Sequence, residues 1–229
     1  MAIARQAWLP IAAVVIVSGL AYALCGLDCS LPLFIVAIVL LFLFRNPERR
    51  VPAVPLAVVS PVDGHITAID EVSDPFLGRQ AFRLTIRMKA SGPWLVRSAM
   101  EGRVMQKWYL PKGLDPHSSN RMDQDALAAY PYAAQPHFVI WVQSDEQDDV
   151  VVALRGAFIS GRMRCGVQTG DRIGQGGRYG LVWFVATADV YLPATSRLEA
   201  SRGGTVRAGS DIIATLVHKE KPAAAPVAG

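Results

Sequence analysis

The chain has 229 residues, of which 52% are hydrophobic, and a formal net charge of +4. This length suits one domain of ordinary size with appendages. The mild positive charge, with no basic run interleaved with aromatic residues, argues against a nucleic-acid-binding protein. The three cysteines, Cys25, Cys29 and Cys165, lack the spacing of a zinc site, so no metal site is predicted.

Two uncharged apolar segments open the chain, and they predict helices over about residues 8–24 and 31–44. Together residues 1–44 are expected to form an α-helical membrane hairpin. A cleaved signal peptide and a single span with an amphipathic neighbour are the alternatives. Cys25 and Cys29 flank the expected turn, where they form either a disulfide or two small apolar positions at the helix ends.

The charges around the hairpin predict its orientation. Arg5 precedes it, three arginines follow it, and the short connecting loop carries only Asp28. By the positive-inside tendency the loop faces outward, and the rest of the chain lies on the cytoplasmic side of the cell (inner) membrane.

Residues 45–52 hold two prolines and three arginines, and they predict a stiff basic linker. Residues 53–218 change to short β-type runs and predict one mostly β domain. Residues 219–229 form an Ala/Pro tail that is expected to be disordered. A long loop is expected over 114–132.

Period-two alternation carries the strand predictions. From Phe82 to Met88, apolar residues alternate with polar ones, which indicates a half-buried strand. The other expected strands are 58–59, 65–69, 138–142, 150–154, 181–185 and 212–217.

Two segments, 167–173 and 206–212, share the pattern Val-x-x-Gly-polar-x-Ile or its close variant, and they predict tight turns at Gly170 and Gly209. Such hairpins are typical of barrel-sandwich β domains. They resemble the hairpins of lipoyl and biotin carriers, but neither turn holds a modifiable lysine, which argues against a carrier.

Five motifs, in order over about residues 42–217, resemble those of the phosphatidylserine decarboxylases, in the short form that starts with a membrane hairpin. They are Phe44–Arg49, Ser60–Gly64, Arg97 with Gly102–Val104, Gly170–Gly180 and Asp189–Pro193. The resemblance implies a barrel-sandwich-like β domain of that family's type.

In that family a serine attacks the carbonyl of the preceding glycine, the chain is cut, and the serine becomes a pyruvoyl cofactor. A histidine takes the proton, and an aspartate orients the histidine. The resemblance places Asp63 at the aspartate position, Trp94 at the histidine position and Ala186, after Val185, at the serine position. A methyl group cannot attack a carbonyl, and an indole N–H cannot act as a base. No pyruvoyl cofactor is therefore predicted.

The alternative is that other side chains replace the missing serine and histidine. Thr187 offers a hydroxyl one residue later, although a one-residue shift in a strand points it to the opposite face. His65 is a possible substitute base. The family's middle Asn-Glu pair is replaced around residues 135–136.

The resemblance implies a membrane-anchored protein of phospholipid metabolism that does not self-cleave and acts as a non-catalytic lipid-binding or regulatory homologue. Arg97 and Arg178 are the candidate headgroup contacts, with ordinary surface ion pairs as the alternative. The expected partners are membrane phospholipid and either an active homologue or a second copy. The rival functions are an active decarboxylase that makes phosphatidylethanolamine through substitute residues, and a purely structural membrane scaffold.

Overall fold

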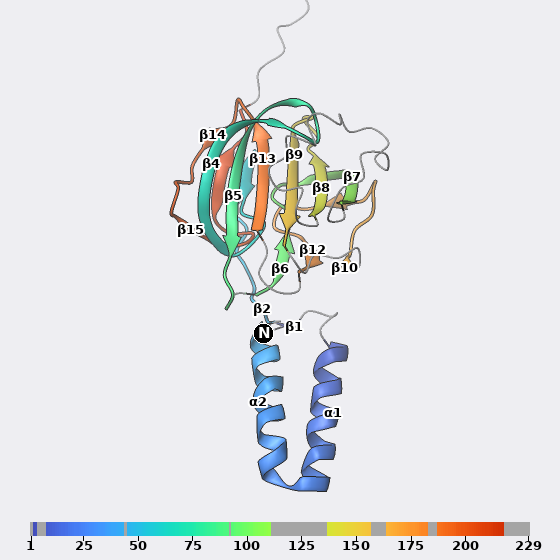
Figure 1. Cartoon of the computed structure of the whole chain (residues 1–229). Coiled ribbons are helices and arrows are strands. Elements are labelled where there is room, and N and C mark those ends of the chain that lie inside the picture. Colours follow the sequence, from blue (N-terminus) through green and yellow to red (C-terminus); the bar gives the residue numbers. More distant parts are fainter. Residues whose placement is uncertain are drawn as a thin grey trace, which may run out of the picture.

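The computed structural model describes residues 2–3, 8–43, 45–91, 93–110, 137–156, 164–182 and 187–217. Figure 1 shows a pair of helices at one end of a curved β domain. The predictions for the 114–132 loop, residues 135–136 and the 219–229 tail lie outside the described residues.

The two predicted helices are confirmed as α1 (Trp8–Cys25) and α2 (Leu27–Leu43), which lie side by side (Figure 1). Gly26 alone separates them. Its φ of 75° is left-handed, and its N–H donates to the Tyr22 carbonyl at 3.0 Å, which closes the last turn of α1. The second helix therefore begins four residues earlier than the sequence predicts.

Large apolar side chains cover the outside of both helices. Ile16, Leu20 and Leu24 on α1 are 62–77% exposed, and Phe34 and Ile38 on α2 are more than half exposed. Within the described residues, neither helix meets the combined length and apolarity needed to cross a bilayer. The membrane hairpin stays a prediction. The Cys25 and Cys29 side chains lie outside the described set, and so does the choice between a disulfide and two apolar helix-end positions.

Two short strands, β1 (Ala2–Ile3) and β2 (Arg45–Asn46), pair where the helices meet the β domain. The linker follows β2. Within the linker, Glu48, Arg50 and Val51 are exposed, whereas Pro47, Arg49 and Pro52 are half-buried.

Among the described residues, eight strands form one antiparallel sheet, ordered β11-β7-β8-β9-β13-β5-β4-β15, which curls across the domain (Figure 1). β13 occupies an inner position between β9 and β5. The strands are β4 (Gly64–Asp74), β5 (Arg79–Met88), β7 (Gly102–Leu110), β8 (His137–Gln143), β9 (Asp149–Arg155), β11 (Arg172–Ile173), β13 (Thr187–Pro193) and β15 (Thr205–Val206).

Two three-stranded sheets complete the described part of the domain. One has the order β10-β12-β6 and the other β14-β16-β3. Their strands are β3 (Ala57–Val59), β6 (Leu95–Arg97), β10 (Arg164–Cys165), β12 (Arg178–Leu181), β14 (Arg197–Leu198) and β16 (Ile212–Thr215).

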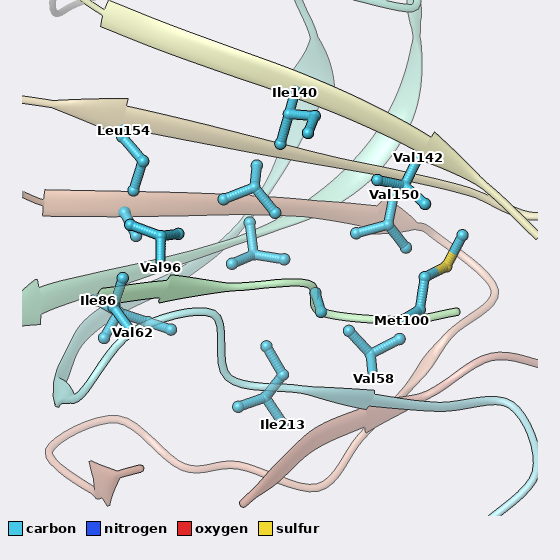
Figure 2. Packing of buried hydrophobic residues seen from close by; sticks show 14 of the residues in the cluster. Val58, Val62, Ile86, Val96, Met100, Ile140, Val142, Val150, Leu154 and Ile213 are labelled. Carbon is cyan, nitrogen blue, oxygen red and sulfur yellow. The ribbon is translucent and has the colours of Figure 1, made fainter. Parts of the chain in front are cut away.

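The main hydrophobic core lies between the curled sheet and the smaller sheets. Figure 2 shows Ile140 and Leu154 from the large sheet packed with Val58, Val96 and Ile213 from the small ones. All five side chains are fully buried, with 0% exposure. This burial explains why the apolar residues recur at every second position. The prediction of a mostly β protein is confirmed.

Alternation on β13 defines the two faces of the large sheet. Ala188, Val190 and Leu192 belong to the main core, whereas Tyr191 belongs to a second apolar cluster on the opposite face. That cluster includes Phe76, whose ring lies 5.6 Å from the Tyr191 ring, edge to face. Thr187 and Asp189 share the face of Tyr191, because side chains alternate along a strand.

The predicted tight turns are confirmed. Gly170 and Gly209 have φ values of 96° and 70°, which side chains other than glycine rarely adopt. The predicted strand over 181–185 is described only in part: β12 ends at Leu181, and residues 183–186 lie outside the described set.

Candidate functional site: arginines around Asp63

Asp63 lies in the turn between β3 and β4 and is only 7% exposed. Its Oδ1 accepts the Ala208 N–H at 2.6 Å, and its Oδ2 accepts Arg49 Nη2 at 2.7 Å. Its backbone carbonyl accepts the Lys89 N–H at 3.0 Å. Both carboxylate oxygens are therefore engaged, and Asp63 joins the linker to the turn that holds Gly209.

Arg97 ends β6 beside Asp63 and is 8% exposed. Its backbone N–H donates to the Pro61 carbonyl at 2.9 Å, two residues before Asp63. Its guanidinium donates to the Gly176 carbonyl at 2.9 Å and to the Pro47 carbonyl at 3.0 Å. The buried side chain thereby bridges the β domain and the linker.

Glycine makes room for the Arg97 side chain. A Cβ on Gly209 would lie 2.8 Å from Arg97 Cδ and 3.2 Å from the Gly176 Cα. Both glycines also have left-handed φ values, 70° for Gly209 and 67° for Gly176. A larger residue at Gly209 would displace the Arg97 stem, and one at Gly176 would meet the Val51 side chain, so the Gly209 turn makes room for Arg97.

Arg178 begins β12 directly opposite Arg97 on β6. It is exposed, and its guanidinium has no ion-pair partner among the described residues. Like charges directly opposite each other on paired strands are destabilising. The pairing therefore places two like charges near each other, and Arg178 lowers the pKa of Arg97.

The surrounding charges make this site cationic. Burial lowers the pKa of Arg97, the neighbouring Arg178 and Arg49 lower it further, and Asp63 opposes them. Arginine nevertheless stays protonated in proteins. Among the described residues, the charges that act on Arg97 come from two further guanidiniums and one carboxylate. Such an arrangement favours an anion, above all one with a planar or tetrahedral set of oxygens.

The structure thus brings together Asp63, Arg97 and Arg178 from the sequence prediction. It adds Arg49, which the sequence analysis treated as an orienting charge, a linker residue and part of a family motif, but not as a site residue. Arg49 closes the Phe44–Arg49 motif, and that position was the available signal. Only the path of the linker shows that Arg49 reaches Asp63.

Trp94 lies in the hydrophobic core. It is 7% exposed and belongs to the main hydrophobic core, where its backbone carbonyl accepts the Val182 N–H at 2.9 Å. Its indole therefore packs with apolar side chains at the position that the resemblance gives to the histidine.

Thr187 begins β13, paired with Arg155 on β9 and with Arg87 on β5. The next residue, Ala188, is buried in the main core, so Thr187 faces the other side of the sheet. Val185 and Ala186 lie outside the described residues. His65 is exposed, and its Nδ1 lies 3.0 Å from Thr205 Oγ1.

Asp189 is a further buried carboxylate, with 0% exposure. It accepts Thr85 Oγ1 at 2.7 Å and Arg155 Nε at 2.7 Å. These partners come from β5 and β9, the two neighbours of β13. Asp189 therefore ties three adjacent strands together, which gives the Asp189–Pro193 motif a structural role.

The family model described as phosphatidylserine decarboxylase matches residues 36–214. The chain is 31% identical over 216 residues to a phosphatidylserine decarboxylase proenzyme of Nitrosomonas eutropha, covering 93% of this chain and 94% of that protein. It is 32% identical over 214 residues to a proenzyme of the same name from Cupriavidus pinatubonensis, covering 93% and 95%. No solved structure matched the chain.

Proposed function

Because the chain belongs to the phosphatidylserine decarboxylase family, we propose that it is a member that does not self-cleave and that binds an anionic phospholipid headgroup without decarboxylating it. It is anchored in the cell (inner) membrane by its helical hairpin, with the β domain on the cytoplasmic side. The observation that carries this proposal is the engagement of Asp63 by Arg49 and by the Ala208 amide.

In a self-processing member, the resemblance gives this aspartate the task of orienting a histidine. Here each of its oxygens already accepts a strong hydrogen bond, at 2.7 and 2.6 Å. A third partner would have to compete with a buried ion pair. Such pairs are costly to break, because the remaining charge is left without compensation.

The residues of this chain do not fit a pyruvoyl group. The serine that would become that group is Ala186, and the glycine before it is Val185. Trp94, at the position of the base, packs in the hydrophobic core. Without the carbonyl cofactor, loss of CO2 from an amino acid headgroup has no electron sink.

The arginine cluster supports headgroup binding. Arg97 and Arg178 face each other, and the second has a guanidinium that no described carboxylate engages. Figure 1 shows β6 and β12 at the end of the β domain nearest the helices. Exposed apolar side chains on α1 and α2 favour contact with lipid. A lipid held by the helices would present its headgroup at this end.

A denaturing gel with intact-mass measurement tests the absence of self-cleavage. We expect one unbroken chain of 24.8 kDa from membranes and after purification. Two fragments with a blocked small-chain N-terminus near residue 186 or 187 would overturn the proposal.

The same samples test the rival function, a working decarboxylase. That function predicts formation of phosphatidylethanolamine from phosphatidylserine, lost in Thr187→Val or Asp63→Ala. We expect none from the unmodified chain, because the substitute hydroxyl of Thr187 lies on the face of the sheet opposite the main core.

Headgroup binding is tested with Arg178→Gln on the full chain in non-ionic detergent, titrated with short-chain anionic phospholipid. A charged hydrogen bond contributes about 1.5–3 kcal/mol, so we expect roughly tenfold weaker binding or more. The matched control is Arg172→Gln, which changes the net charge equally. Arg172 is exposed on β11 and already pairs with Glu101 and Asp145.

Equal weakening by both variants would indicate a general charge effect and would contradict a headgroup site at Arg178. A regulatory role belongs to the same proposal and predicts that the uncut chain co-purifies with an active homologue or with a second copy of itself.

A further inference from the structure

We propose that the β domain carries a further ligand site, a pocket that binds a small alkylammonium ion. The pocket has a volume of about 330 Å³, at the lower end of the range for small-molecule sites in proteins. Arg49, Arg97 and Arg178 do not line it, so this site goes beyond the proposed function and is tested separately.

Five segments that are distant in the sequence enclose the pocket. They are residues 54–57, which lead into β3, residues 100–101 between β6 and β7, residues 144–146 in the β8–β9 turn, Gln175 and Leu216. Two hydrogen bonds join these walls. The Leu216 N–H donates to the Leu56 carbonyl at 2.9 Å, and Gln175 Nε2 donates to the Ala57 carbonyl. The pocket is therefore present in the folded domain before any ligand binds.

Apolar side chains form the floor of the pocket. Met100 and Leu216 are 3% and 4% exposed, and both belong to the main hydrophobic core, where Figure 2 shows Met100 near Val58. Leu56 is half-buried and packs against the same core. Such a floor favours a hydrocarbon chain, because binding the chain removes apolar surface from water. The ligand should therefore carry a short alkyl chain.

Carboxylates form the rim of the pocket. Glu101, Asp145 and Glu146 line it and are exposed. Arg172 pairs with Glu101 at 3.4 Å and with Asp145. Glu146 has neither an ion pair nor a hydrogen-bond partner among the described residues. Exposed carboxylates alone would be ordinary solvated surface, but here they border a cavity with an apolar floor, and that combination favours a cation with an alkyl chain.

Gln175 adds a neutral acceptor to the pocket. Its side chain is half-buried, and because the Ala57 carbonyl can only accept, the amide nitrogen must face that carbonyl. Its Oε1 is then left as an acceptor to which no described group donates. Carboxylates and an amide oxygen accept hydrogen bonds, whereas a primary ammonium donates three. The polar groups thus favour a primary ammonium over an alcohol or an acid.

The position of the rim favours a soluble ligand. β9 runs toward the helices in Figure 1, so the β8–β9 turn before it lies at the opposite end of the β domain. Asp145 and Glu146 belong to this turn. A free amine and the lysine side chain of a partner protein share the required chemistry, and their affinities distinguish the two sources.

The test uses the full chain in non-ionic detergent, with isotope-labelled methionine methyl groups followed by NMR. The Met100 methyl reports on the pocket floor, and its signal is assigned with Met100→Leu. The probes at neutral pH are n-butylamine, which is protonated, and n-butanol, which has the same chain without the charge. One carboxylate at about 4 Å in water-like surroundings changes cation affinity by roughly fivefold. We therefore expect butylamine to bind at least about fivefold more tightly than butanol.

Two variants change the charge of the rim in opposite directions. Glu146→Gln removes one negative charge and keeps the shape of the side chain. It should weaken butylamine binding roughly fivefold and leave butanol binding unchanged. Arg172→Gln frees Glu101 and Asp145 from their cation, so it should strengthen butylamine binding by a similar factor.

Each variant has a control that changes the net charge equally. Glu71→Gln is the control for Glu146→Gln, because Glu71 is exposed on β4, does not line the pocket and has no ion pair among the described residues. Arg197→Gln is the control for Arg172→Gln, because Arg197 is exposed on β14 and pairs with Glu199 at 3.3 Å. Both controls should bind butylamine like the unmodified chain.

The outcomes are distinct from those for the headgroup site. No shift of the Met100 methyl with butylamine overturns the pocket as a ligand site. Equal affinity for butylamine and butanol, or equal weakening by Glu146→Gln and Glu71→Gln, overturns the selection of a cation. The third probe is N-acetyl-lysine methylamide. Tighter binding of this probe than of butylamine supports a lysine side chain as the source, and equal or weaker binding supports a free amine.

Discussion

Asp189 is the buried charge on which three strands depend. Its two oxygens serve Thr85 and Arg155, and it has no solvent contact. Asp189→Ala would remove the carboxylate that pairs with Arg155, whose side chain is 11% exposed. Breaking a buried pair in this way typically costs about 3–5 kcal/mol. We expect a loss of that order in the free energy of unfolding, measured by denaturant titration.

The control is Asp70→Ala on the same face of the same sheet. Its pair with Arg83 is partly exposed, and such pairs contribute about 0–1 kcal/mol. The expected order is therefore a large effect at Asp189 and a small one at Asp70. Comparable losses at both positions would contradict a special structural role for the Asp189–Pro193 motif.

At the scale of elements, glycine fixes how closely strands approach. Gly102 begins β7, and a Cβ there would overlap the backbone carbonyl of Gln143, near the start of the β8–β9 turn. The backbone would have to shift, and overpacking of this kind costs about 1–3 kcal/mol. We expect Gly102→Ala to lower stability by that amount in thermal or chemical unfolding.

Gly174→Ala provides the matched control. It lies between β11 and β12, nothing lies within 4 Å of its added Cβ, and its φ is not left-handed. We expect Gly174→Ala to leave the stability of the fold nearly unchanged. If both variants are neutral, the close approach at Gly102 is not a constraint on the sheet.

The sequence predicts these elements well where one local rule decides. Alternation from Phe82 to Met88 places Leu84 and Ile86 in the core, as observed, and glycine marks the turns at Gly170 and Gly209. It fails where a contact joins distant segments. Arg49 meets Asp63 only because the linker runs along the β domain, and no local pattern encodes that path. The early start of α2 was missed because a single glycine can turn the chain.

For the molecule as a whole, the helices present an apolar outside. Ile16 and Leu20 lie one turn apart on α1 and are 70% and 62% exposed. A charged side chain in a bilayer costs about 2.5–3.5 kcal/mol on insertion scales. We expect the Ile16→Glu, Leu20→Glu double variant to move the chain from the membrane fraction to the soluble or aggregated fraction after cell lysis.

Tyr109→Glu with Val217→Glu is the corresponding change on the β domain, at side chains that are 40% and 47% exposed. It adds the same two negative charges and should leave fractionation unchanged. Retention of both variants in the membrane fraction would show that another surface provides the attachment.

The inner position of β13 bears on the family's history. β13 is hydrogen-bonded to β9 and β5, while β15 and β16, from the same C-terminal stretch, pair with β4 and β3. A break in the peptide chain just before β13 would leave these pairings intact, and the two fragments would stay associated. The fold therefore does not depend on whether the chain is cut at this point. Selection for a folded domain would therefore not by itself preserve the residues that perform such a cleavage.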